Sequence, residues 1–155
     1  MIFPIRRFPL SRPDPVHPDR RYRLRPVIRL LVAGPGGRVL CSPTVDTGAV
    51  SILLPRADGD RIGITSFVST GTLFGVGTSR SAPLTVDYAE VLLRVWQGDE
   101  VCQWKAVVGF TEARMSSDGL FGIFGGLEYF HTTLDVFANQ LSLIPRVSLP
   151  VAEGL

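Results

Sequence analysis

One aspartate stands between two apolar segments and is the residue of this sequence best placed to do chemistry. Asp46 follows an apolar, strand-like run that ends at Val45, and Thr47-Gly48-Ala49 leads from it into the apolar residues 52–54. A lone carboxylate is costly to bury between two core strands. Asp and Gly also suit turns, so an Asp-Thr-Gly triplet is common by itself. The apolar residues on both sides and the small Ala49 make this copy a candidate site.

Two carboxylates at close range can hydrolyse a peptide bond without a metal ion or a nucleophilic side chain. Like charges at that distance cannot both ionise, so the pair shares one proton and titrates as a pair. The ionised member takes a proton from water as general base, and the protonated member polarises the scissile carbonyl. The chain contains one Asp-Thr-Gly triplet.

The segment around Asp46 resembles the catalytic Asp-Thr-Gly-Ala of the single-lobed, retropepsin-like aspartic proteases. The resemblance implies that Asp46 is one half of a catalytic dyad, that the Thr47 hydroxyl braces the dyad across a dimer axis, and that Gly48 lets substrate and backbone approach. It also implies an all-β fold: a single-lobe closed barrel with one short C-terminal helix. The expected function is an aspartic endopeptidase that acts as a homodimer on a polypeptide substrate, with no cofactor and no metal.

A glycine-rich stretch, Gly75-Val76-Gly77, follows the Asp46 segment. A phosphate-binding loop would need a third Gly, a Lys and a following helix, which are missing here. The stretch resembles the flap of the same family, which implies that Gly75, Val76 and Gly77, together with Ala49, contact the substrate. An ordinary flexible hairpin is the alternative. Ile52 and Leu54 are further candidates for lining the pocket.

The stretch 119–135 resembles the element that closes the family's fold. Its order is two apolar residues and a Gly, then a short helix over Leu127–Phe130, then a strand; Phe121 and Gly122 would have a structural role beside the site. Many single-lobed members carry an Arg after that Gly, where it steadies the dimer through ion pairs. This chain has Ile123, so that brace is absent.

The remaining periodicity predicts strands joined by turns. A strand beginning at residue 24 and ending near residue 32 should return through a turn at 34–37, and residues 38–45 should deliver Asp46. Residues 56–61 could form one helical turn or a loop. Further strands are expected over residues 64–70, 84–95, 101–110 and 140–145.

Other residue types give weaker candidates. Cys41 and Cys102 match no metal or redox spacing, and Cys41 is expected to be a buried free thiol. His17 and His131 belong to no catalytic pattern. The sequence has no Gly-x-Ser-x-Gly elbow. The loop aspartates, Asp58, Asp60 and Asp118, are interpreted as solvated turn residues, and Trp96 and Trp104 as packing residues.

Length and composition bound the class of protein. A chain of 155 residues with 45% apolar and 19% charged residues is expected to form one ordered domain. We divide it into a Pro/Arg-rich arm (1–22), a protease-like domain (23–146) and a short tail (147–155). No apolar run is long enough to span a membrane, and no signal peptide is recognisable, so a cytoplasmic location is the default expectation.

Arginine is concentrated near the N-terminus. Eight of the fifteen arginines lie in the first 29 residues. An anionic partner is one interpretation and a solvated tail is the other. The net charge of +2 is small, and aromatic residues do not alternate with the arginines along the chain as a stacking surface would require. These observations favour the solvated tail, with neither a nucleic-acid nor a membrane partner.

Two rival interpretations of the whole chain remain. The same fold could serve as a peptide-binding or dimerisation module with slow or absent turnover. Alternatively, the chain could be an unrelated β-barrel or sandwich in which Asp46 only caps a turn. The intact Asp-Thr-Gly argues against the first rival, and Ile123 in the usual Arg position argues weakly for it.

Overall fold

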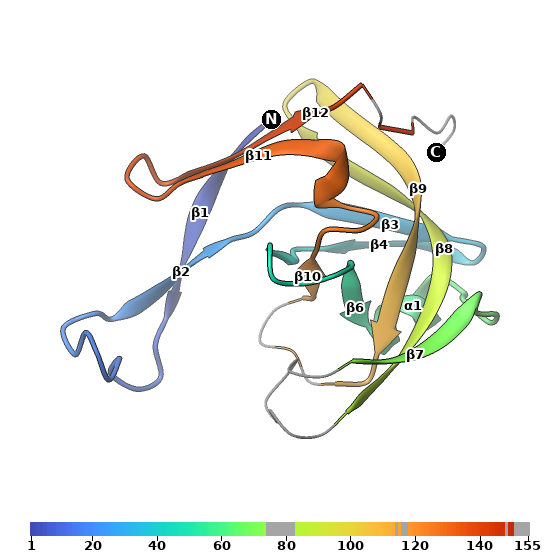
Figure 1. Ribbon diagram of the computed structural model, residues 1–155, viewed down its shortest axis with the longest axis horizontal. Helices are drawn as coiled ribbons and strands as arrows, with labels where there is room; N and C mark the ends of the chain where they lie inside the picture. The colour runs from blue at the N-terminus through green and yellow to red at the C-terminus, as the bar shows by residue number, and fades with distance from the viewer. Residues whose placement is uncertain (74–82, 114, 116–117, 148, 151–155) are drawn as a thin grey trace.

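The structure is a computed structural model of the 155-residue chain that describes residues 1–73, 83–113, 115, 118–147 and 149–150. Strands dominate this described part, so the predicted all-β class is confirmed (Figure 1). The first half contains β1 (Ile2–Pro9), β2 (Tyr22–Pro26), β3 (Leu30–Gly34), β4 (Gly37–Cys41), β5 (Thr44–Val45), β6 (Leu53–Pro55), helix α1 (Arg56–Arg61) and β7 (Ser69–Leu73). The second half contains β8 (Leu84–Gln97), β9 (Glu100–Thr111), β10 (Leu120–Phe121), the 3-10 helix η1 (Leu127–Tyr129), β11 (Phe130–Asp135) and β12 (Gln140–Pro145).

The strands form two sheets that meet beside β5. The smaller sheet has the order β11-β12-β1-β2, and the larger has the order β4-β3-β8-β9-β6-β10-β5, with β7 paired to β8. An isolated antiparallel bridge between Val27 and Thr44 links the sheets. This bridge, with the Ile28 N–H donated to the Pro43 carbonyl at 3.3 Å, occupies the outer side of β5.

The larger sheet is strongly curled. Figure 1 shows β8 and β9 curving around one side of the molecule. The two ends of the strand order, β4 and β5, are consecutive parts of one segment of the chain, so the sheet curls back toward its own first strand. The predicted all-β fold with a curled, barrel-like sheet is therefore confirmed.

The β8–β9 hairpin is the longest element and supports the rest. Its strands pair continuously from Asp87–Phe110 to Gln97–Glu100. The turn falls at Gly98, whose φ of 57° is favourable for glycine. The strands predicted at 84–95 and 101–110 are confirmed: buried and more exposed residues alternate along most of β8, and both faces of β9 are buried at residues 102–104 and 108–111.

An aromatic cluster fills the core between the two sheets. Trp104 is fully buried, and its indole N–H donates to the Gly125 carbonyl at 2.8 Å. Its ring makes edge contacts with Phe121, Tyr129 and Phe130 at centroid distances of 5.5–6.4 Å. The cluster therefore ties β9 to the segment that follows β10, and the expected packing role of Trp104 is confirmed.

Two predicted strands differ from the observed ones. The strand expected over 64–70 begins only at Ser69, because the backbone N–H of Ile64 donates to Gly59 of α1 and packs that segment under the helix. The single strand expected from residue 24 is divided into β2 and β3, because the chain crosses from the smaller sheet to the larger at Val27.

The N-terminal residues belong to the smaller sheet. Phe3 pairs with Leu141 of β12, and Phe3 and Ile5 are both 3% exposed. The expected extended arm is thus extended, but its first residues contribute to the core. Residues 10–21 connect β1 to β2, and this hairpin projects from the body of the molecule (Figure 1). The domain boundaries at residues 22 and 146 remain predictions.

We expect Trp104→Phe to lower the free energy of unfolding by about 2–3 kcal/mol, because it removes buried ring volume and leaves the Gly125 carbonyl without its donor. Trp96 is only half-buried, so Trp96→Phe is the matched control and should cost less. Urea unfolding followed by far-ultraviolet circular dichroism gives both values. Equal costs for the two variants would contradict the role of Trp104 as the centre of the core.

Candidate functional site

The turn that carries Asp46 is held between two other segments. β5 pairs in parallel with β10, with Val45 opposite Phe121. The Asp46 N–H extends this pairing by donating to the Phe121 carbonyl at 3.1 Å. β10 also pairs with β6, so it lies between the strand that enters the turn and the strand that leaves it. The position of the Asp46 backbone is therefore fixed from the core side.

The side chain of Asp46 is fixed on one of its two oxygens. Oδ1 accepts the Gly48 N–H at 2.8 Å, and the Asp46 carbonyl accepts the Ala49 N–H at 3.2 Å. This is the local turn that Asp residues often form with the backbone two residues ahead. Within the described part of the chain, Oδ2 makes no hydrogen bond. Asp46 is half-buried while Thr47 and Gly48 are exposed, so the second oxygen is available at the surface of the turn.

Gly122 allows an unusually close crossing of backbones beside this turn. A Cβ at position 122 would lie 2.3 Å from the Ser51 carbonyl oxygen and 2.7 Å from that of Ala49. The chain then continues in register, since Ile123 donates to Ala49 at 3.0 Å and Phe124 to Val50 at 2.8 Å. The predicted neighbours Phe121 and Gly122 thus do lie against the Asp46 turn.

The predicted flap residues Gly75, Val76 and Gly77 lie outside the described residues. The strands on either side of them, β7 and β8, are described, and their pairing ends with Leu73 opposite Leu84. Leu73 lines a small cavity of about 90 Å³ together with residues 48–51 of the Asp46 turn, Leu53 and Leu120. The end of the β7–β8 hairpin therefore reaches the candidate site.

Two of the expected lining residues are in the core instead. Ile52, Leu53 and Leu54 are all buried, and of the three only Leu53 contributes to the wall of the small cavity. The apolar run 52–54 has no alternation that could show which of its residues lines a cavity.

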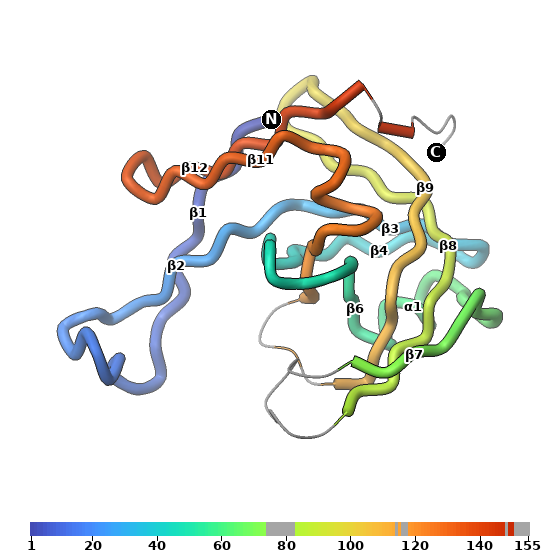
Figure 2. The backbone as a smooth tube through the Cα atoms, in the orientation of Figure 1, coloured from blue at the N-terminus to red at the C-terminus, as the bar shows by residue number. Residues whose placement is uncertain are grey.

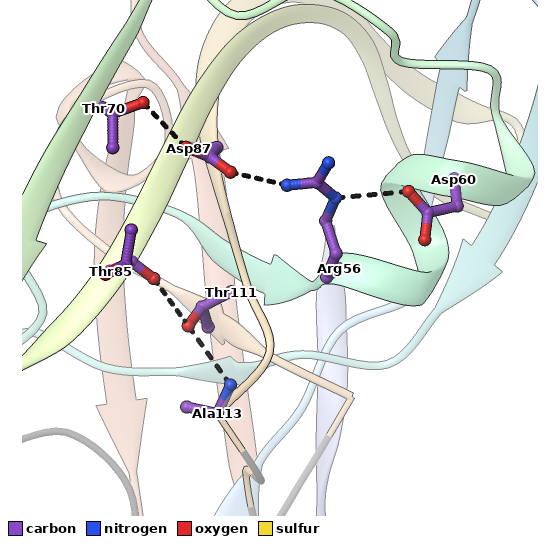
Figure 3. A network of polar contacts seen from close by, with 7 residues as sticks. All are labelled: Arg56, Asp60, Thr70, Thr85, Asp87, Thr111 and Ala113. Carbon is purple, nitrogen blue, oxygen red and sulfur yellow. Dashed lines mark hydrogen bonds and ion pairs between the residues drawn. The ribbon is translucent and has the colours of Figure 1, made fainter.

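A polar network anchors the base of the β7–β8 hairpin (Figure 3). The Arg56 guanidinium at the start of α1 binds Asp60 through Nε at 3.2 Å and also pairs with Asp87 of β8. Asp87 in turn accepts the Thr70 hydroxyl of β7 at 2.7 Å. Arg56 and Asp87 also line a cavity of about 390 Å³ with Phe110 and Thr111, but no residue of the Asp46 turn contributes to it.

One loop aspartate differs from expectation. Asp58 lies in α1 with only 7% exposure, so the interpretation of it as a solvated turn residue is wrong. Burial is the main reason that its pKa is raised, and the nearby Asp118 raises it further, while Arg61 at 3.2 Å opposes both. This burial results from tertiary packing, because α1 lies against β4, β6 and β9, and the residues next to Asp58 in the sequence do not indicate it.

The buried thiol expected at position 41 is confirmed. Cys41 is 4% exposed, and both cysteines are free. Burial raises the pKa of the Cys41 thiol to about 12, so it is not a nucleophile. Within the described residues, no three His, Cys, Asp or Glu side chains gather closely enough to hold a metal ion, and no helix has the length and apolar character to cross a membrane.

Comparison with known proteins gives structural likenesses and no sequence match. No family profile and no curated protein sequence matches the chain. Among solved structures, the EIAV protease complexed with the inhibitor HBY-793 matches with a TM-score of 0.37 and 15% sequence identity, over 63% of this chain and 81% of that one. A TM-score this low does not establish a shared fold.

We expect Gly122→Ala to destabilise the protein by about 3 kcal/mol, because its new methyl group would meet two backbone carbonyl oxygens that cannot move aside cheaply. Gly71→Ala is the matched control, since only the flexible ring of Tyr88 lies near that position, at 3.3 Å. Thermal unfolding of both variants tests this. A wild-type midpoint for Gly122→Ala would show that the crossing is looser than described.

We expect the ionisation of Asp58 to lower the free energy of unfolding as the pH rises. Because its pKa is raised in the folded state, the folded protein retains a proton that the unfolded chain has lost, so stability falls as pH rises above the ordinary aspartate value of 3.8. Asp58→Asn removes this effect, and the variant should gain stability relative to wild type between about pH 3 and pH 7. Urea unfolding across that range measures it, and a constant difference would contradict it.

Proposed function

We propose that this chain is an aspartic endopeptidase whose active site forms across a homodimer, with one Asp46 from each copy. The observation that carries the proposal is the Asp46 turn itself. Its backbone is held by β10, one carboxylate oxygen is bonded to Gly48, and the side chain is half-buried beside the exposed Thr47 and Gly48. Its sequence, Asp-Thr-Gly-Ala, has the residue types that retropepsin-like proteases use at that position.

An apolar surface beside the turn supports the assembly of two copies. Val50, Ile123 and Phe124 are 59%, 39% and 59% exposed, and the Phe124–Val50 hydrogen bond holds them together. Exposed apolar groups gathered in one place favour an interface. Ile123 replaces the Arg that many family members use as an ion-pair brace, so we propose that apolar contact performs this role here. Thr47 is exposed next to this surface and can reach the partner.

The proposed dyad performs acid–base chemistry on a bound water. Two Asp46 carboxylates at hydrogen-bonding distance share one proton, because both cannot ionise so close together. The ionised one removes a proton from the water, and the protonated one polarises the peptide carbonyl. Since the two groups are the same residue, only the substrate decides which is acid and which is base. The Gly48–Asp46 bond keeps the carboxylate oriented without using its second oxygen.

An extended polypeptide is the substrate that this arrangement suits. The small cavity beside Gly48, Ala49 and Val50 is lined mainly by backbone and apolar groups, which bind a peptide through strand-like hydrogen bonds and side-chain contacts. We propose that the hairpin that continues β7 and β8 closes on the peptide and excludes water, with Gly75, Val76 and Gly77 at its tip. The Arg56–Asp87–Thr70 network would then hold the base of this hairpin against α1.

The test is cleavage of a mixed peptide library between pH 3 and 7 at two protein concentrations. Wild type should cleave, with activity that rises faster than linearly with concentration, because the dimer is the active form. Asp46→Asn should abolish cleavage, whereas Asp99→Asn, in the exposed turn between β8 and β9, should leave it unchanged. Phe124→Ser should lower the fraction of dimer in sedimentation analysis and lower the activity in parallel.

Two results would replace this proposal. A folded dimer that binds peptides without cleaving them would indicate a peptide-binding module. Cleavage that persists in Asp46→Asn would place the chemistry elsewhere, or in a contaminant, and would remove the reason for a dyad.

A further inference from the structure

The β1–β2 hairpin carries a positive charge that the rest of the chain does not share. Residues 1–29 contain eight arginines and two aspartates, a net charge of +6. Residues 30–155 contain eight basic and twelve acidic residues, a net charge of −4. The modest overall charge thus conceals a strong separation, and such separation indicates a site for an anionic partner.

The strand register gathers these charges on one face of the hairpin. Arg6 lies directly opposite Arg25, and Phe8 lies opposite Arg23. Because opposite residues of an antiparallel pair share a face, these three arginines surround Phe8 on the same side. Like charges placed opposite each other destabilise a strand pair. Arg6 and Arg25 therefore place two positive charges opposite each other on this face, where an anion can contact both.

Aromatic rings support the guanidinium groups across the strand pair. Arg25 lies over the Phe8 ring at 5.1 Å, and Arg7 lies over the Tyr22 ring at 4.6 Å. Aromatic and basic residues do not alternate along the chain, but the pairing of β1 with β2 places them next to each other. A guanidinium stacked by its flat face keeps its N–H groups at the edge, where they can bind phosphate oxygens in pairs. Within the described part of the chain, no carboxylate forms an ion pair with Arg6, Arg7 or Arg23.

The hairpin also has a shape that a nucleic-acid duplex can accept. Figure 2 shows the chain leaving the body along β1, turning, and returning along β2, so that two strands and their connection stand clear of the larger sheet. A two-stranded β-ribbon fits the major groove of B-form DNA. Insertion into a membrane surface would instead favour a continuous apolar face, whereas guanidinium groups lie over the rings of both Tyr22 and Phe8.

We propose that the β1–β2 hairpin is a binding site for duplex DNA, which it contacts through backbone phosphates without selecting a base sequence. The arginines on the Phe8 face, with Arg21 that precedes them on the same face, contact the phosphates on either side of the groove. This site is separate from the Asp46 turn and does not depend on proteolysis. It also revises the expectation of a solvated tail, which rested on the order of residues along the chain.

The test is fluorescence anisotropy of a labelled mixed-sequence DNA duplex with the full chain. If four arginines contact phosphates, the logarithm of the binding constant should fall against the logarithm of salt with a slope of about −3 to −4, a loss of about 100-fold between roughly 50 and 200 mM salt. The double variant Arg6→Gln/Arg23→Gln should reduce this slope by about 2. Arg38→Gln/Arg146→Gln removes the same charge from exposed positions outside the hairpin and should leave the slope unchanged.

Three results would overturn the proposal. The first is no binding to the duplex at the lowest salt concentration. The arginines would then serve only to keep the edge of β2 from pairing with a strand of another chain. The second is an equal reduction of the salt slope by the two double variants. That result would mean that DNA binding depends on the total charge of the protein and not on a site at the hairpin. The third is binding to anionic phospholipid vesicles but not to the duplex. Circular dichroism of each variant ensures that lost binding is not lost folding, and removing Arg6 from its place opposite Arg25 should not lower the unfolding midpoint.

Discussion

The close crossing of two backbones at Gly122 is the constraint on which the candidate site depends. Asp46 has a defined position because its N–H binds the Phe121 carbonyl, and this bond forms only if β10 runs directly beside β5. The residue that continues β10 then passes between the Ala49 and Ser51 carbonyls with no room for a side chain. One glycine therefore allows the turn before it and the segment after it to share a single rigid arrangement.

The rest of the fold supports this crossing from two sides. On the core side, Trp104 of β9 contacts Phe121 and binds the Gly125 carbonyl, so the longest hairpin is fastened to the segment that holds Asp46. On the outer side, Val27 and Ile28 occupy the edge of β5 where the chain passes between the sheets. β5 therefore has a neighbour on each side, β10 and the Val27–Ile28 segment, before the chain enters the Asp46 turn.

The two proposed sites lie on different parts of this small chain, and one is apolar while the other is positively charged. The surface of Val50, Ile123 and Phe124 beside Asp46 is apolar, and it would be buried if two copies associate. The β1–β2 hairpin bears the arginines, and its connection to β12 through Phe3 fixes it to the body. Binding of DNA at the hairpin would therefore not compete with pairing of the Asp46 turns. If both proposals hold, DNA would raise the local concentration of chains and favour the dimer.

The sequence by itself determined the elements whose pattern is local. The β8–β9 hairpin follows from two long apolar runs around Gly98, and the strand at 140–145 and the short helix after Gly126 follow from equally local signals. Asp46 and its neighbours could be chosen because they lie between apolar runs and resemble a known catalytic segment. Tertiary structure decided the rest. The burial of Asp58, the place of Leu53 in the wall of the small cavity and the gathering of arginines around Phe8 depend on which distant segments pack or pair, and in what register. These contacts cannot be read from one segment of the sequence. The energy of a buried charge or of a cross-strand pair depends on both segments that meet, and only the tertiary structure decides which segments meet.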